Sequence, residues 1–233
     1  MDRRLREAWT KLIGIDDYEA HMALTGQAQA NAELVTELFH SYPPTHGAAI
    51  LFAGAGTGQL FEYVSPLLLS PFRTTFSDIN PEYLSRLASR ISNFQAITFE
   101  TALDDVENSQ LAPGFELVIA VLVLEHVDWR KAIRTICHLS THRVFLVVQE
   151  NPPDLKTAIT MKRPCIGSMR VFKEVNPELL PRATVETEFG KHGFVWSRLS
   201  SRQVLDEKKM IALKFQRQEN LENTFPEGPC DLR

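Results

Sequence analysis

The sequence predicts an α/β fold in three layers, α/β/α, around a mostly parallel seven-stranded sheet that ends in an antiparallel hairpin. Short apolar runs alternate with amphipathic segments through residues 46–150, a pattern typical of parallel strands covered on both faces by helices. Near the C-terminus, two extended segments are joined by a short link that includes Leu205 to Lys208. A link this short cannot hold a crossover helix, so the two strands are expected to pair antiparallel.

Residues 1–45 are predicted to form a helical cap ahead of the sheet. Apolar residues recur there at three- and four-residue spacing, which is the period of a helix face. Gly14, with the aspartates that follow it, predicts one break and therefore two helices. The run Ser41-Tyr-Pro-Pro ends the second helix, because proline cannot continue a helix and disfavours helical backbone in the residue before it.

Strands and helices are then predicted to alternate. The strands are placed at residues 48–53, 74–77, 96–99, 115–121 and 144–148, and the helices at residues 59–69, from Pro81 onward and at 129–139. Asn80 suits the N-cap of the middle helix and Pro81 its first position. Ligands bind such sheets in the crevice at the carboxyl ends of the strands, so site residues are sought there.

The domain is expected to span residues 46–217, followed by a flexible tail at 218–233. The closing hairpin is placed at 194–204 and 210–216. Residues 152–185 carry five prolines and weak periodicity, and they are predicted to form a loop-rich insertion. Long irregular insertions in compact domains are often functional.

Composition excludes several classes of protein. The 233 residues suit one large domain, and a net charge of −4 argues against a nucleic-acid partner. No apolar stretch is long enough to span a membrane, and no signal peptide is evident. The three cysteines show no metal-ligand spacing, so a reduced, cytoplasmic protein without a metal site is expected.

A glycine-rich turn follows the first predicted strand, in Ile50-Leu-Phe-Ala-Gly54-Ala-Gly56-Thr-Gly58-Gln. Glycines at alternate positions allow a positive φ and a close approach of ligand to backbone, and amides at the start of the next helix point at the ligand. The dinucleotide fingerprint needs a sixth-position glycine, where this chain has Gln59. The pattern therefore disfavours a nicotinamide-dependent oxidoreductase, which stays a third hypothesis.

Two further marks follow the turn. Asp78 lies 20 residues after Gly58 at the end of the second predicted strand, where its carboxylate can accept hydrogen bonds from ribose hydroxyls. The alternative is that Asp78 only caps the helix that follows. The apolar fourth strand runs into Leu124-Glu125-His126-Val127.

In this order and at these distances, the three marks resemble the class I S-adenosylmethionine-dependent methyltransferases that act on small molecules. The resemblance covers residues 47–150, and the closing hairpin agrees with it. It implies a Rossmann-like fold, S-adenosylmethionine as cofactor, and a small-molecule substrate bound by a monomer or homodimer. A non-catalytic, cofactor-binding relative of the same fold is the alternative.

The resemblance also implies which residues bind the cofactor. The glycine loop, with Ala53 and Ala55 beside its glycines, matches the family's contact with the methionine part. Asp78 matches the ribose ligand. The other implied contacts are Ile79, Ala102 and Leu103 at the adenine, with Asp104 as the nearest acid, Ala120 and Val121 at the end of the fourth strand, and Tyr18 in an N-terminal helix. Gln27 lies in an amide-rich stretch that either meets the cofactor carboxylate or forms a solvated helix face. The family often has an acid two places before the first glycine, where this chain has Phe52.

Candidates for the chemistry are few, because methyl transfer from a sulfonium depends mainly on proximity and alignment. A general base is needed only where the acceptor must lose a proton. Glu125 and His126 follow the fourth strand near the expected methyl group; alternatively they cap and orient the next helix. His21 shares a helix face with Tyr18, in a helix that either covers the site or simply packs on the sheet.

Overall fold

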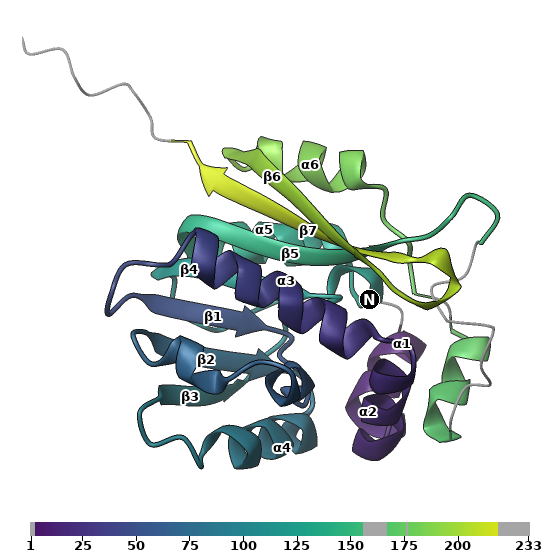
Figure 1. Ribbon diagram of the computed structural model, residues 1–233. Coiled ribbons are helices and arrows are strands. Elements are labelled where there is room, and N and C mark those ends of the chain that lie inside the picture. The colour runs from purple at the N-terminus through teal and green to yellow at the C-terminus, as the bar shows by residue number, and fades with distance from the viewer. Residues whose placement is uncertain (1–2, 156–166, 176, 219–233) are drawn as a thin grey trace, which may run out of the picture.

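The computed structural model describes residues 3–155, 167–175 and 177–218, and their strands form one seven-stranded sheet (Figure 1). The order is β3-β2-β1-β4-β5-β7-β6. The first five strands are parallel, and β7 is antiparallel to both β5 and β6. This confirms the predicted fold class. The strands are β1 (Ala49–Ala53), β2 (Arg73–Asp78), β3 (Thr98–Leu103), β4 (Phe115–Val121), β5 (Ser140–Glu150), β6 (Phe194–Gln203) and β7 (Lys209–Arg217).

Helices cover both faces of the sheet because its strands are apolar on both faces. Along β1, Leu51 packs with α5 (Trp129–Leu139) and α6 (Arg182–Lys191). Its neighbour Phe52 packs on the opposite face with α3 (Gln27–Ser41) and α4 (Pro81–Ile91). Successive strand residues point to opposite faces, so one short strand contributes to both cores.

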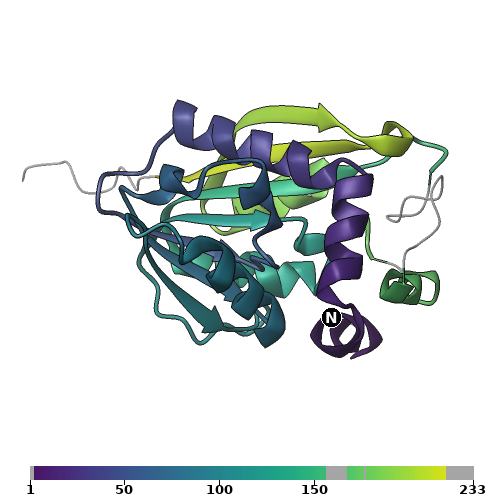
Figure 2. The same ribbon diagram turned by 60° about the horizontal axis from the view of Figure 1, so that its bottom comes forward.

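The N-terminal cap contains one break more than the single break predicted. α1 (Arg3–Glu7) and the π-helical turn η1 (Ala8–Leu12) precede Gly14, and α2 (Ile15–Leu24) follows it. A second break separates α2 from α3 at Gly26, whose φ of +75° is left-handed. α1 and α2 lie beyond the carboxyl ends of β1 and β2 (Figures 1 and 2).

The helix predicted at 59–69 is wrong. Two 3-10 turns stand there, η2 (Gln59–Glu62) and η3 (Pro66–Leu69). Pro66 disfavours helical backbone at Ser65, which is extended and caps η3 by accepting a hydrogen bond from the Leu67 amide. The third strand also lies later than predicted, at residues 98–103 rather than 96–99.

The predicted insertion at 152–185 contains more helix than expected. The 3-10 segment η5 (Gly167–Lys173) and the start of α6 fall inside it, whereas residues 156–166 lie outside the described residues. Val185 and Phe189, four residues apart, are the buried contacts of α6 with the core, a weak helical signal that sequence reasoning passed over. Of the predicted tail, only Gln218 is described.

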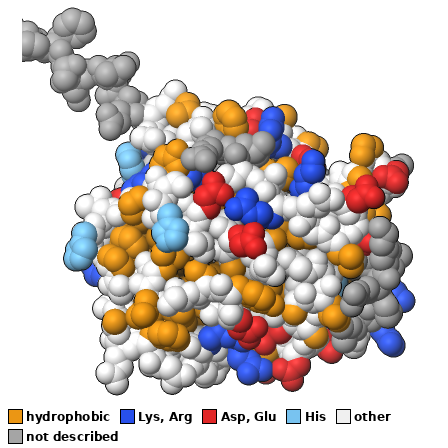
Figure 3. Space-filling model, in the orientation of Figure 1, with side chains coloured by type: hydrophobic (Ala, Val, Ile, Leu, Met, Phe, Trp, Pro, Cys, Tyr) orange, Lys and Arg blue, Asp and Glu red, His pale blue; other side chains and the backbone are white. Residues whose placement is uncertain are grey.

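Within the described ranges, no helix combines the length and apolar character that crossing a bilayer requires. On the face seen in Figure 3, acidic and basic side chains of the described residues are interspersed.

Asn80 joins the sheet, α4 and the N-terminal cap. Its Oδ1 accepts hydrogen bonds from the amides of Glu82 at 2.9 Å and Tyr83 at 3.3 Å, which confirms the predicted N-cap. Its Nδ2 donates to the carbonyl of Trp9 at 2.9 Å. We expect Asn80→Ala to lower the free energy of unfolding by about 1–2 kcal/mol, because the cap is lost.

Urea denaturation of the wild type and Asn80→Ala measures this difference. Asn93→Ala, at an exposed position just past the same helix, is the control. An equal loss in both variants would contradict a specific role for the cap.

Candidate functional site

A cavity lies at the carboxyl ends of β1, β2 and β4, and residues of the N-terminal cap and of η5 line its other side. Its lining combines the glycine loop with strand ends on one side and helical residues on the other. The lining residues are Trp9, Tyr18, His21, Met22, Gln27, Ala28, Asn31, Phe52 to Leu60, Asp78, Ile79, Tyr83, Asp104 to Val106, Ile119, Val121 to Val123, Glu125 to Val127, Gln149, Met169 and Phe172. The cavity therefore lies where the topology predicts a ligand site.

The three glycines of the loop have different physical roles. All have left-handed backbone, with φ of +66° at Gly54, +57° at Gly56 and +67° at Gly58. A Cβ at Gly54 would lie 2.6 Å from Val123 Cγ2, and one at Gly58 would lie 2.9 Å from Leu87 Cγ. A Cβ at Gly56 would meet only Tyr18, at 3.5 Å. Packing therefore excludes a side chain at the outer two positions, whereas Gly56 faces the cavity.

Asp78 fixes the shape of this loop. Its Oδ2 accepts a hydrogen bond from the Gly56 amide and its Oδ1 accepts one from the Asn80 amide, both at 2.9 Å. Burial raises the pKa of Asp78, and the backbone amides that donate to it act in the opposite direction. Asn80, rather than Asp78, is the N-cap of α4. The alternative that Asp78 only caps this helix is therefore insufficient.

Aromatic rings from the cap lie over the loop. Tyr18 of α2 stacks on Tyr83 of α4 at 5.5 Å between ring centroids. Trp9 makes edge-to-face contacts with Tyr18 at 5.8 Å and with His126 at 4.8 Å, and lies 5.5 Å from Phe172. Burial raises the pKa of the Tyr18 hydroxyl, which stays protonated. The rings join the cap, α4 and η5 into one aromatic wall of the cavity.

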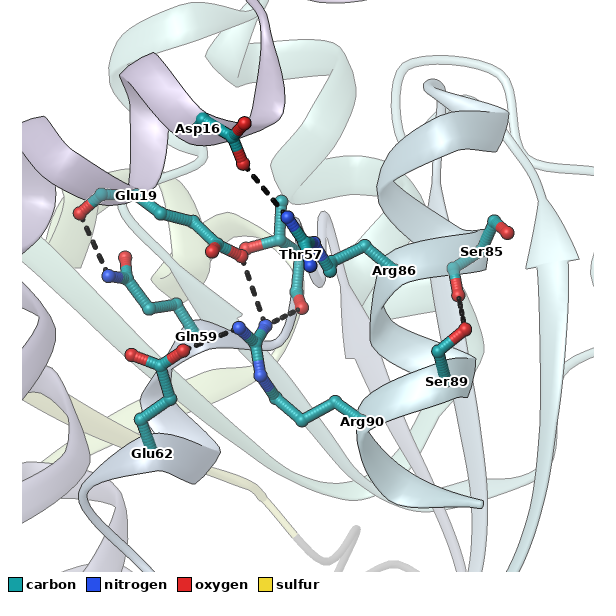
Figure 4. A network of polar contacts seen from close by, with 9 residues as sticks. All are labelled: Asp16, Glu19, Thr57, Gln59, Glu62, Ser85, Arg86, Ser89 and Arg90. Carbon is teal, nitrogen blue, oxygen red and sulfur yellow. Dashed lines mark hydrogen bonds and ion pairs between the residues drawn. The ribbon is translucent and has the colours of Figure 1, made fainter. Parts of the chain in front are cut away.

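Polar contacts through Arg90 hold α2 against the loop (Figure 4). Arg90 of α4 donates to the Thr57 carbonyl at 2.5 Å, to Glu19 at 3.1 Å and to Glu62 at 2.6 Å. Gln59 donates from Nε2 to the Glu19 carbonyl at 2.8 Å. The loop and the helix above it therefore share one largely buried cation.

A second set of contacts fastens η5 to the cap. The amide and the hydroxyl of Ser168 both donate to Asp17 Oδ2 at 2.7 Å, and they lower the pKa of Asp17. The Ser168 hydroxyl also accepts from the Gly14 amide at 3.0 Å. Because η5 is held here, Met169 and Phe172 reach the cavity.

Glu125 lies in the 3-10 turn η4 (Leu124–His126) and is only 3% exposed. Its Oε1 accepts from the Gln149 amide at 2.7 Å, whereas its Oε2 has no hydrogen-bond partner. Burial raises the pKa of Glu125 to about 7. The Gln149 side chain accepts in turn from Gln27 Nε2 at 3.1 Å. A carboxyl group in this state can gain or lose a proton at neutral pH.

The two histidines of the cavity are neutral at pH 7. Burial lowers the pKa of His126 to about 4, and its Nδ1 has no hydrogen-bond partner. Burial and the neighbouring Lys208 lower the pKa of His21 to about 4. Neither imidazole therefore contributes positive charge to the cavity.

Most of the residues predicted for the site are brought together in this cavity. These are Tyr18, His21, Gln27, Ala53, Gly54, Ala55, Gly56, Gly58, Asp78, Ile79, Val121, Glu125 and His126, together with Phe52 and Asp104. Ala102, Leu103 and Ala120 do not line it. Ala102 and Leu103 still belong to β3, which ends later than predicted, and the chain enters the cavity only after this strand. Leu103 is 66% exposed. Ala120 points from β4 into the core on the α5 face.

Sequence reasoning missed several lining residues. Asp105 and Val106 stand two or three places beyond the predicted adenine rim, so a corrected strand end would have found them. Thr57 and Gln59 lie in the loop itself, between and after the predicted glycines. Trp9, Tyr83, Gln149, Met169 and Phe172 gave no signal, because only the folded chain brings their segments together.

Unpartnered polar atoms concentrate in this cavity. Within residues that the structure describes, six of its lining residues have a buried side-chain nitrogen or oxygen without a hydrogen-bond partner: Trp9, Asn31, Thr57, Gln59, Glu125 and His126. Such atoms are rare in folded proteins, because each costs free energy unless something pairs with it. These atoms are available to pair with polar groups of a ligand. The described part of the chain holds no group of three or more potential metal ligands.

Comparison with known proteins agrees with this geometry. A family model described as "Methyltransferase domain" matches residues 51–147, from β1 to β5. No curated protein sequence matches the chain significantly.

Several solved structures share the fold. Magnesium protoporphyrin IX methyltransferase from Synechocystis PCC 6803 with bound S-adenosylmethionine is 17% identical at a TM-score of 0.60, over 92% of this chain and 90% of that one. N-methyltransferase NodS from Bradyrhizobium japonicum WM9, in complex with S-adenosylhomocysteine, is 16% identical at 0.56, over 80% and 85%. A putative methyltransferase from Bacillus halodurans C-125 is 10% identical at 0.61, over 81% and 100%. At these identities the likeness establishes the fold. The matched model identifies a methyltransferase domain in residues 51–147.

Proposed function

We propose that this protein is an S-adenosylmethionine-dependent methyltransferase that acts on a small-molecule acceptor. The hydrogen bond from the Gly56 amide to Asp78 carries the proposal, because it joins the glycine loop to the ribose-binding acid inside the cavity. The unpartnered polar atoms around them fit a ligand with as many polar groups as this cofactor.

Each part of the cofactor has a proposed set of partners. Asp78 accepts from the ribose hydroxyls, and Ile79 lies beside the adenine. Asp104 and Asp105, which line the cavity after β3, bound the adenine in place of the predicted Ala102 and Leu103. The glycine loop and Tyr18 enclose the methionine part.

Phe52 stands where the family often has an acidic residue, and in this proposal two other side chains replace that acid. Phe52 packs in the core 5.1 Å from Phe76, so a carboxylate is absent there. Unpartnered Asn31 Oδ1 and Gln59 Oε1 are acceptors for the cofactor's amino group. Gln27, four residues before Asn31, faces the same cavity.

The bound cofactor supplies an electrophilic methyl group on a sulfonium that is already a good leaving group. The residues of this chain then contribute alignment and the exclusion of water by the cap and η5. Glu125, whose pKa is raised to about 7, is the proposed general base wherever the acceptor must lose a proton. His126 and His21 are neutral and serve as hydrogen-bonding groups at the wall.

A non-catalytic relative that binds the cofactor remains the second candidate, favoured by Phe52 in the place of the usual acid. Cofactor binding without turnover against a broad acceptor panel would favour it. A thermal-shift titration with S-adenosylmethionine, S-adenosylhomocysteine and NAD tests the cofactor. Stabilisation by the first two supports the proposal, and stabilisation by NAD alone would instead favour an oxidoreductase.

We predict that Asp78→Ala weakens S-adenosylhomocysteine binding by about 1–3 kcal/mol, because ribose hydroxyls and the Gly56 amide lose their acceptor. Isothermal titration calorimetry measures the change. Asp154→Ala, which removes an exposed carboxylate outside the cavity, should bind as the wild type does. Unchanged affinity in Asp78→Ala would contradict the ribose assignment.

Substitutions at two glycines of the loop should affect cofactor binding and protein stability separately. Gly56→Val is expected to abolish cofactor binding, because its side chain enters the cavity below Tyr18. Gly58→Ala is expected to lower the free energy of unfolding by about 1–3 kcal/mol, because its Cβ meets Leu87 and its φ is positive. Calorimetry and chemical denaturation of both variants test this. A Gly56→Val protein that binds normally would contradict the placement of the loop.

Glu125 should leave a signature in the pH dependence of stability. Its folded pKa of about 7 lies above its ordinary 4.5, so between these values the folded protein holds a proton that the unfolded chain has lost. The stabilising contribution of the neutral carboxyl is full below about pH 4.5 and lost as the pH rises to about 7.

Glu125→Gln removes this titration while preserving the group's shape. We expect the variant to gain stability relative to the wild type as the pH rises through this window, as followed by thermal denaturation. Other titrating groups cancel in the difference. A difference in Tm that is constant with pH would show that Glu125 has an ordinary pKa.

A further inference from the structure

Apart from the histidines, the titratable side chains described in this cavity lining are acidic or tyrosine hydroxyls. Its lining includes four carboxyl groups, Asp78, Asp104, Asp105 and Glu125, and neither lysine nor arginine among the residues that the structure describes. Both histidines are neutral at pH 7. A phosphate or carboxylate on an acceptor would therefore meet no cationic side chain here, and the negative groups would repel it.

Three of the four carboxylates already have partners. Asp78 is held by backbone amides, Asp104 accepts from the Gln110 amide at 2.9 Å, and Asp105 forms an ion pair with Arg6 at 2.5 Å. Glu125 differs, because it lines the cavity and its Oε2 is buried without a hydrogen-bond partner. An ionised carboxylate in this position is costly unless a donor, and best a cation, pairs with it.

The aromatic rings that line the cavity also favour a cationic ligand. The rings of Trp9, Tyr18, Tyr83 and Phe172 line the same cavity. Trp9 lies 5.5 Å from Phe172, so these two rings bound one side together. Aromatic faces carry partial negative charge and attract ammonium groups, most strongly where water is excluded. They also accommodate an apolar body attached to that ammonium.

We propose, resting on the proposed function, that the methyl acceptor is an amine with an apolar body, bound as its ammonium ion against Glu125 Oε2. Glu125 is then both the specificity-determining group and the base. An alcohol or phenol would satisfy one hydrogen bond but would leave the carboxylate without a countercharge.

The reaction balances with the groups present. Glu125 takes one proton from the ammonium, which frees the nitrogen lone pair. The amine nitrogen attacks the methyl carbon, the N–C bond forms, and the C–S bond breaks with its electron pair going to sulfur. The products are the methylated ammonium ion, S-adenosylhomocysteine and protonated Glu125, which returns its proton to solvent when the products leave.

The test uses three probes that share a phenyl ring and a two-carbon arm: phenethylamine, phenethyl alcohol and hydrocinnamate. Their dissociation constants are measured by calorimetry with the full-length protein, both free and saturated with S-adenosylhomocysteine. We expect the amine to bind at least about tenfold more tightly than either other probe, equivalent to about 1.4 kcal/mol. Glu125→Gln should remove this preference, and Glu174→Gln, at an exposed position of the chain after η5, should retain it.

The outcomes separate the two proposals. Absence of S-adenosylhomocysteine binding contradicts the proposed function. Three results overturn the amine assignment alone when S-adenosylhomocysteine binds normally. They are equal affinities for the three probes, a preference for the alcohol or the carboxylate, and no binding of any probe. An amine preference that survives in Glu125→Gln also overturns it. The order of probe affinities in the wild-type protein tests the amine assignment even if Glu125→Gln fails to fold.

Discussion

The hydrogen bond between the Gly56 amide and Asp78 is the contact on which the site depends. It links the loop after β1 to the end of β2 and sets the loop's left-handed turns. The Ala55 amide donates to the Ser77 carbonyl at 2.9 Å and reinforces this link. Burial raises the pKa of this carboxyl group, and its backbone amide donors oppose that shift. The cavity floor is thereby fixed before any ligand binds.

Apolar and polar contacts together hold the cover of the cavity. Trp9 and Tyr18 of the cap pack in one apolar cluster with Phe172 of η5. Arg90 ties Glu19 of α2 to the glycine loop, and Asp17 ties α2 to Ser168 of η5. Arg90 and Glu19 are both largely buried, so their ion pair is shielded from solvent. Because α2 and η5 both line the cavity, these contacts form part of its wall.

Burial determines the protonation states inside the cavity. Burial raises the pKa of Glu125 to about 7, and His21 and His126 lose their positive charge for the same desolvation reason. A cavity with carboxylates and neutral imidazoles complements a cationic ligand. Sulfonium and ammonium groups both fit that description, so one electrostatic environment serves the proposed cofactor and the proposed acceptor.

The sequence by itself determined the sheet, its closing hairpin, the glycine loop, Asp78 and the Leu124-Glu125-His126-Val127 turn. These are local patterns, because an apolar run, a glycine at positive φ or a cap depends on neighbouring residues. It placed the end of β3 too early, so Ala102 and Leu103 were predicted in place of Asp105 and Val106. The tertiary structure alone decided that Trp9, Gln149 and Phe172 share one cavity, and that Glu125 is buried with a raised pKa. Those properties arise from contacts between segments far apart in the chain, and no local pattern encodes the desolvation that they produce.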